Sequence, residues 1–114
     1  MLNWPPSVRI WRATRATDRR TSFATLAEVV RQQLQADPFS GHLFVFRNRR
    51  ADRVKLLYWD EDGFVLVYKR LEQGSFRFPT ASSAGVEIRA ADLLLLLDGV
   101  DVESVRRQRR YRRP

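Results

Sequence analysis

The sequence predicts a single α+β domain in which an antiparallel sheet of about four or five strands packs against two helices. Three observations support this expectation. The chain has 114 residues, which leaves room for one hydrophobic core. Hydrophobic residues make up 44% of it, which is typical of a globular protein. Finally, several segments show strand periodicity, whereas one early segment shows helical periodicity and one late segment is a run of leucines.

The first two predicted elements are a strand and an amphipathic helix. Residues 8–13 alternate apolar and polar side chains, which favours a half-buried strand with Arg9 facing solvent. Residues 21–35 place their apolar side chains at the spacing of one helical face. Those side chains are Phe23, Leu26, Ala27, Val30 and Leu34. Pro38 and Gly41 then end the helical segment, because proline disfavours helical geometry at the preceding residue and glycine accepts a positive φ.

Three strongly apolar segments follow and predict an antiparallel meander over residues 42–47, 53–59 and 64–70. The connection at 48–52 is short and polar. The connection at 60–63 ends in an Asp-Gly dipeptide, which is typical of a hairpin turn.

Both faces of this meander carry apolar side chains, so we expect a covering layer on each side. The first helix supplies one layer. Residues 90–97, which include five consecutive leucines, supply the other as a helix that is apolar all round and ends at Gly99. A short strand over 86–88 leads into it.

Positive charge gathers at the C-terminus. The chain has 21 basic and 13 acidic residues, and six arginines lie in residues 104–114 without any acid. These arginines are Arg106, Arg107, Arg109, Arg110, Arg112 and Arg113. We therefore expect one domain over 1–103 and a disordered basic tail over 104–114 that is available to a polyanion such as DNA. The alternative is a terminus that only adds solubility.

Two further arginine clusters lie in the predicted domain. Arg47, Arg49, Arg50 and Arg53 bracket the first hairpin, and arginines at the tip of a two-stranded ribbon can contact DNA phosphates. The alternative is that exposed turns collect charge of any kind. The second cluster is Arg12, Arg15, Arg19 and Arg20 around Asp18, and here the alternative is that Asp18 caps the following helix.

This sequence contains few residues suited to catalysis or metal binding. There is no cysteine and one histidine, His42, which no serine or carboxylate accompanies in an identifiable pattern. The acidic residues 60–62 are typical of a solvated turn, with a divalent-metal site for a nuclease-like enzyme as the alternative. The glycines form no phosphate-binding loop. We therefore expect no enzyme, no metal, no cofactor and no small-molecule substrate.

No apolar run approaches the roughly 18 residues that span a bilayer, and the N-terminus has no secretory pattern. We expect a cytoplasmic protein, associated with the nucleoid when it is bound to DNA, that does not interact with membranes.

Several segments match a known family in order and spacing. They read TDRRTSF at 17–23, DPFSGHLFVFRNRRAD at 37–52, KLLYWD at 55–60 and YKRLEQGSF at 68–76. Over about residues 8–101 the chain resembles the TnpB-type accessory protein encoded by the second reading frame of bacterial insertion sequences of the "sixty-six" class. The resemblance implies a small noncatalytic protein that works beside a separate transposase during DNA transposition.

Two functional hypotheses follow. In the first, the protein binds DNA, such as the terminal repeats of the element, through Arg19, Arg20, the hairpin arginines and the tail. In the second, it is a protein–protein adaptor without direct DNA recognition. It would then dock on the transposase or another element-encoded protein through the leucine helix at 93–97 or the loop at 76–79.

Overall fold

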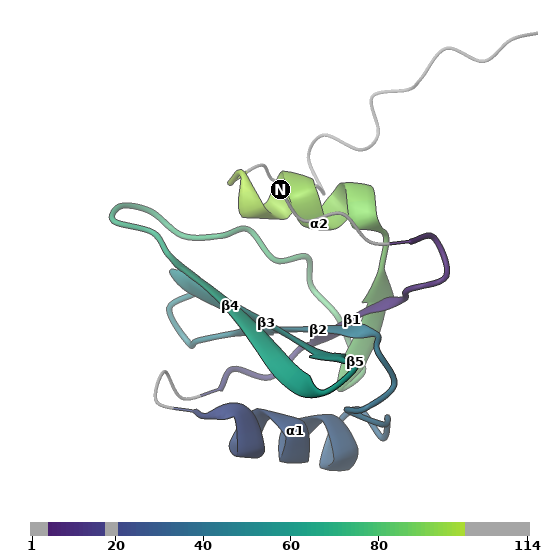
Figure 1. Cartoon of the computed structure of the whole chain (residues 1–114). Helices are drawn as coiled ribbons and strands as arrows, with labels where there is room; N and C mark the ends of the chain where they lie inside the picture. Colours follow the sequence, from purple (N-terminus) through teal and green to yellow (C-terminus); the bar gives the residue numbers. More distant parts are fainter. Residues whose placement is uncertain (1–4, 18–20, 100–114) are drawn as a thin grey trace, which may run out of the picture.

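The computed structural model describes residues 5–17 and 21–99, and it confirms the predicted α+β class. Figure 1 shows one sheet with a helix on each face. The elements in chain order are β1 (Ile10–Ala13), α1 (Phe23–Gln32), β2 (Leu43–Arg47), β3 (Arg53–Asp60), β4 (Gly63–Arg70), β5 (Gly85–Ile88) and α2 (Ala90–Leu97). In the sheet the strands lie in the order β4-β3-β2-β1-β5.

The predicted meander is confirmed, since β2 pairs antiparallel with β3 and β3 pairs antiparallel with β4. The β3–β4 ladder runs from the Arg53 and Arg70 pair to the Asp60 and Gly63 pair. Two residues therefore form the connecting loop, and the first of them, Glu61, has a positive φ of 56°. The acidic segment is thus a tight hairpin turn, as predicted. Its two loop residues are Glu61 and Asp62 instead of the Asp-Gly dipeptide, because Gly63 is already the first residue of β4 and pairs with Asp60.

One strand pairing differs from the expected antiparallel sheet. β1 pairs parallel with β2, with Ile10 beside Leu43 and Arg12 beside Val45. The reason is the connection: α1 packs on one face of the sheet between the two strands, and such a crossover returns the chain in its original direction. β5 covers the other side of β1 and pairs with it antiparallel, so the sheet is mixed.

Each helix covers its own hydrophobic core, as the apolar residues on both strand faces predict. On the α1 side, Leu26 and Val30 pack with side chains of three strands: Ala13, Phe44, Phe46 and Leu57. On the α2 side, Leu93 and Leu96 pack with the opposite face of the sheet and with the loop residue Phe76. The sheet residues in that second core are Ile10, Leu43, Val45, Val54 and Leu56. The strand alternation therefore divides the apolar side chains between two layers.

The helix boundaries match the prediction at α2 and differ at α1. α2 spans the expected residues, and Gly99 follows it with a positive φ of 82°. α1 is shorter than the predicted 21–35, because Ser22 has extended backbone geometry and the helix ends at Gln32. Of the predicted apolar face, Phe23 is 45% exposed and so is not a core residue.

In the part of the chain that the structure describes, no helix is long and apolar enough to cross a membrane. The predicted tail at 104–114 and the predicted cap Asp18 lie outside the described residues. The helix begins after Ser22, which forms no side-chain capping bond to the backbone.

Candidate nucleic-acid interface

The two ends of the sheet differ in charge. At one end β1, β2 and β4 finish and β3 begins, and arginines gather in and beside these strand ends. We call this the basic end, and its described arginines are Arg12, Arg15, Arg47, Arg49, Arg50, Arg53, Arg70 and, in the loop after β4, Arg77. At the opposite end, the β3–β4 turn carries Asp60, Glu61 and Asp62, all exposed. The antiparallel meander thus places the basic and acidic turns at opposite ends of β3.

The β2–β3 turn at 48–52 is held by the side chain of Asn48. Its Oδ1 accepts a hydrogen bond from the Arg53 backbone N–H at 2.9 Å, and its Nδ2 donates to the Asp52 carboxylate at 2.6 Å. The Asn48 carbonyl also accepts the Ala51 N–H at 3.1 Å, and Ala51 has a positive φ of 59°. The hydrogen bond from Asn48, assisted by the positive charge of Arg53, lowers the pKa of Asp52.

This turn separates the four predicted hairpin arginines into two classes. Arg49 and Arg50 are exposed, and neither forms a hydrogen bond or ion pair with the described residues. Arg53 lies 3.6 Å from the Asp52 carboxylate, and its side chain is only 18% exposed. Arg47 donates to the carbonyls of Thr14 at 2.7 Å and Asn48 at 3.3 Å. Of the four, Arg49 and Arg50 are therefore the two that are exposed and make no hydrogen bond or ion pair with the described residues.

The sequence hypothesis placed Arg12 beside Asp18 and did not include it among the nucleic-acid-binding residues. In the structure Arg12 is buried on β1, with 3% of its surface exposed, and it donates to the Pro79 carbonyl at 2.8 Å. Burial, followed by the nearby charge of Arg47, lowers the pKa of Arg12. Strand alternation could have revealed this position, because Arg12 shares the inward face of the strand with Ile10.

Arg12 and Arg47 line a polar cavity of about 520 Å³. The hairpin contributes Ala51 to its wall, and the loop between β4 and β5 contributes a segment from Ser75 to Ala81 that includes Arg77. The hypothesis also missed Arg77, which lies in a loop without any periodic pattern.

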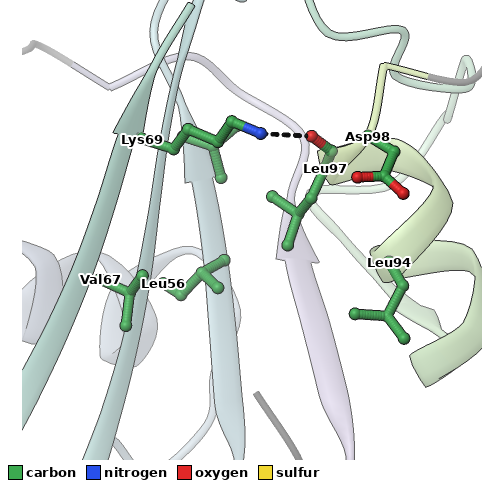
Figure 2. Close-up of a pocket in the computed structure, with 7 residues that line it drawn as sticks. Leu56, Val67, Lys69, Leu94, Leu97 and Asp98 are labelled. Atoms are coloured by element: carbon green, nitrogen blue, oxygen red, sulfur yellow. Dashed lines mark hydrogen bonds between the residues drawn. The ribbon is translucent and has the colours of Figure 1, made fainter. Parts of the chain in front are cut away.

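A second cavity, of about 680 Å³, lies between α2 and the strands β3 and β4. Figure 2 shows Leu94 and Leu97 of the helix facing Leu56 and Val67 of the sheet across it. Lys69 closes one end by donating to the Leu97 carbonyl at 2.8 Å. This cleft is mainly apolar.

The two surfaces predicted for an adaptor differ in exposure. In the leucine run, Leu94 and Leu95 are 38% and 37% exposed, whereas Leu93 and Leu96 are buried. In the 76–79 loop, Phe76 is only 2% exposed and belongs to the core. The loop therefore offers little apolar surface, and α2 remains the better candidate for protein docking.

The two groups considered for catalysis are His42 and the acidic turn at 60–62. His42 accepts the Arg9 backbone N–H on Nδ1 at 2.9 Å, just before β2 begins. Within residues 5–17 and 21–99, no three His, Asp or Glu side chains are arranged to hold a metal ion. The acidic turn thus has the geometry of an exposed hairpin.

The remaining predicted site residues lie outside the described part of the chain and stay predictions. They are Arg19, Arg20, Arg106, Arg107, Arg109, Arg110, Arg112 and Arg113.

Comparison with known proteins yields one family. A sequence profile described as "IS66 Orf2 like protein" matches residues 8–107. Two proteins of Sinorhizobium fredii (strain NBRC 101917 / NGR234) are also similar. The uncharacterized protein y4hO is 41% identical over 101 residues, which cover 89% of this chain and 88% of the relative. The uncharacterized protein y4jC is 38% identical over 108 residues, covering 95% and 92%. No solved structure matches the chain significantly.

Proposed function

The chain belongs to the IS66 Orf2-like family of insertion-sequence accessory proteins, and on that premise we propose that it is a noncatalytic protein that binds DNA during transposition. One observation carries the proposal: Arg49 and Arg50 are exposed, and make no hydrogen bond or ion pair with the described residues, at the tip of a hairpin that Asn48 holds in shape. Phosphate contacts by arginine orient a protein on DNA.

The charge around these two arginines supports the same proposal. Arg15 is exposed at the same end of the sheet, and the acidic turn lies at the other end. Arg70 is also exposed there, but it pairs with Glu72 at 3.2 Å. A polyanion that approaches the basic end therefore meets arginines without meeting the acidic turn. The tail arginines would add sequence-independent affinity, because each neutralised phosphate contributes about −0.9 to the slope of log K against log salt.

The test compares two neutralised turns in the full chain. Arg49→Gln with Arg50→Gln removes two positive charges from the basic end, and Glu61→Gln with Asp62→Asn removes two negative charges from the acidic turn. We expect the arginine variant to weaken binding to duplex DNA and to reduce the magnitude of the salt slope by about 2. We expect the acidic-turn variant to bind almost as the wild type does. Affinity should be measured at several salt concentrations on the element's terminal repeats and on shuffled DNA.

Equal and opposite effects in the two variants would show that only net charge matters, and the hairpin would lose its assigned role. A chain of residues 1–103 then separates the tail from the domain. If all six tail arginines contact phosphates, their removal reduces the magnitude of the salt slope by about 5. A preference for the terminal repeats that survives the truncation would place recognition in the folded domain.

The adaptor hypothesis has one structural observation in its favour, the apolar cleft beside the exposed residues Leu94 and Leu95. If the protein is an adaptor, Leu94→Gln should weaken capture of the purified transposase and leave DNA binding unchanged. The arginine variant should do the reverse. The two experiments together distinguish the two functions.

A further inference from the structure

The polar cavity at the basic end contains two arginines that the fold brings together. Arg12 and Arg47 lie near the ends of β1 and β2, which are parallel neighbours. The register pairs Arg12 with Val45, so Arg47 is two residues further along and projects from the same face of the sheet. The loop that carries Phe78 and Pro79 covers both side chains.

No carboxylate among residues 5–17 and 21–99 pairs with these two arginines. Among the described residues, no Asp or Glu lies within ion-pair distance of Arg12 or Arg47, and the cavity wall contains no acid. Only 3% of the surface of Arg12 is exposed, and its Nε has no hydrogen-bond partner. Buried charges are normally paired, because removing them from water costs free energy. Two such guanidinium groups side by side are suited to bind an anion.

Both guanidinium groups are already held in position. Arg12 Nη2 donates to the Pro79 carbonyl at 2.8 Å, and Arg47 Nη2 donates to the Thr14 carbonyl at 2.7 Å. Both groups also lie over the Phe78 ring, at 5.5 and 5.7 Å from its centroid. A guanidinium has five N–H donors, so each arginine keeps donors for a ligand after making these contacts. Such preorganisation lowers the cost of ordering the side chains when a ligand binds.

The surrounding groups suit a phosphate. Ser75 and Thr80 line the same cavity and carry hydroxyl groups, and the exposed Arg77 adds a third guanidinium to its wall. Arginine forks bind phosphate oxygens in a bidentate manner, and hydroxyls donate to the remaining oxygens. We propose that this cavity binds a phosphate group between Arg12 and Arg47, with Arg77 at its exposed side. This site is distinct from Arg49 and Arg50, and it does not depend on their binding DNA.

The first experiment uses inorganic phosphate and the full chain. Calorimetric titration is run against chloride at equal ionic strength, so that nonspecific screening is matched. Arg47→Gln and Arg12→Lys are compared with the wild type, since the lysine keeps the charge but loses the fork. We expect both variants to bind phosphate at least about tenfold more weakly, because charge-assisted hydrogen bonds are lost.

The control is Arg9→Gln, which makes the same charge change as Arg47→Gln. Arg9 is exposed and pairs with Glu87 at 2.9 Å, away from the cavity wall. The Arg9→Gln variant should bind phosphate as the wild type does. Because Arg12 is buried, its variant is first checked for folding by circular dichroism. If it does not fold, Arg47→Gln and Arg77→Gln decide the question, since Arg77 is exposed.

A second set of titrations identifies the source of the phosphate. Oligonucleotides with a 5′-phosphate and with a 5′-hydroxyl are compared in the wild type and in Arg47→Gln. A preference for the 5′-phosphate that disappears in the variant assigns the cavity to a strand end. Equal weakening for both oligonucleotides assigns it to the DNA backbone, and an effect on inorganic phosphate alone assigns it to a free anion.

The proposal is overturned if wild-type titrations with phosphate and chloride do not differ. It is also overturned if phosphate binds equally well to the wild type and to both cavity variants, in which case the two arginines only anchor the loop. Arg49→Gln with Arg50→Gln should change DNA affinity without changing the affinity for inorganic phosphate. The failure of the phosphate site and the failure of the DNA-binding hairpin are therefore separate results.

Discussion

The strand β3 begins and ends in tight turns of opposite charge. Its first turn contains Arg49 and Arg50, and its last turn consists of Glu61 and Asp62. The backbones are alike in one respect, because each turn has a non-glycine residue with positive φ: Ala51 at 59° and Glu61 at 56°. A hairpin needs an allowed left-handed residue and exposed polar side chains, and both acids and bases meet the second need. The fold therefore does not require arginine at the first turn.

The largest expected effect is on DNA affinity and comes from exchanging the charged residues of the two turns. A variant with Arg49→Glu, Arg50→Glu, Glu61→Arg and Asp62→Arg keeps the net charge of the chain but moves the exposed arginines to the other end of β3. If the position of the arginines matters, its DNA affinity should fall by about tenfold or more, since at least two phosphate contacts are lost. Filter-binding titrations at fixed salt provide the measurement. Wild-type affinity in this variant would show that the basic end has no special role.

The next effect is on stability and concerns the side-chain hydrogen bonds that hold the first turn. Asn48→Ala removes the acceptor of the Arg53 backbone N–H and the donor to Asp52, so we expect a loss of about 1 kcal/mol in the free energy of unfolding. Urea unfolding followed by tryptophan fluorescence measures this. Asp62→Asn in the other turn serves as the control and should stay within about 0.5 kcal/mol of the wild type. A stability unchanged by Asn48→Ala would mean that the turn does not depend on its side-chain bonds.

A smaller effect should be common to both turns. Ala51→Gly and Glu61→Gly each relieve the steric cost of a left-handed residue, and each adds flexibility to the unfolded chain. Because these effects oppose each other, we expect each variant to change stability by less than about 1 kcal/mol, with the same sign in both turns. Thermal unfolding of the two variants makes the comparison. Opposite signs would show that the turns differ in backbone strain as well as in charge.

The smallest effect is a dependence of stability on pH at the basic turn. The folded protein lowers the pKa of Asp52 below 3.8, chiefly through the hydrogen bond from Asn48. A lowered carboxyl pKa stabilises the fold above the unfolded-state value, and this contribution is lost as the pH falls from about 3.8 toward the folded-state pKa. We expect the effect to be small because it comes from one partly exposed carboxylate. Urea midpoints measured across this range should decline less steeply in Asp52→Asn and in Asn48→Ala than in the wild type. Equal declines in all three proteins would contradict this assignment.

Much of the fold was predictable from local patterns. The leucine run at 90–97 marks α2, and the three apolar segments mark β2, β3 and β4 with their connecting turns. These elements are set by periodicity and by turn residues, which act over a few neighbouring positions. The parallel pairing of β1 and β2 was not predicted, although the helix between them is the usual sign of a crossover connection.

The candidate sites divide in the same way. The sequence by itself determined that the hairpin at 48–52 carries exposed arginines, because both the turn and the charges are local features. Only the tertiary structure decided that Arg47 is held by Thr14, 33 residues away. The same is true of the cavity that joins Arg12 to Arg47. Its charges come from two strands and a loop, and their meeting depends on strand order and register, which short-range patterns do not encode.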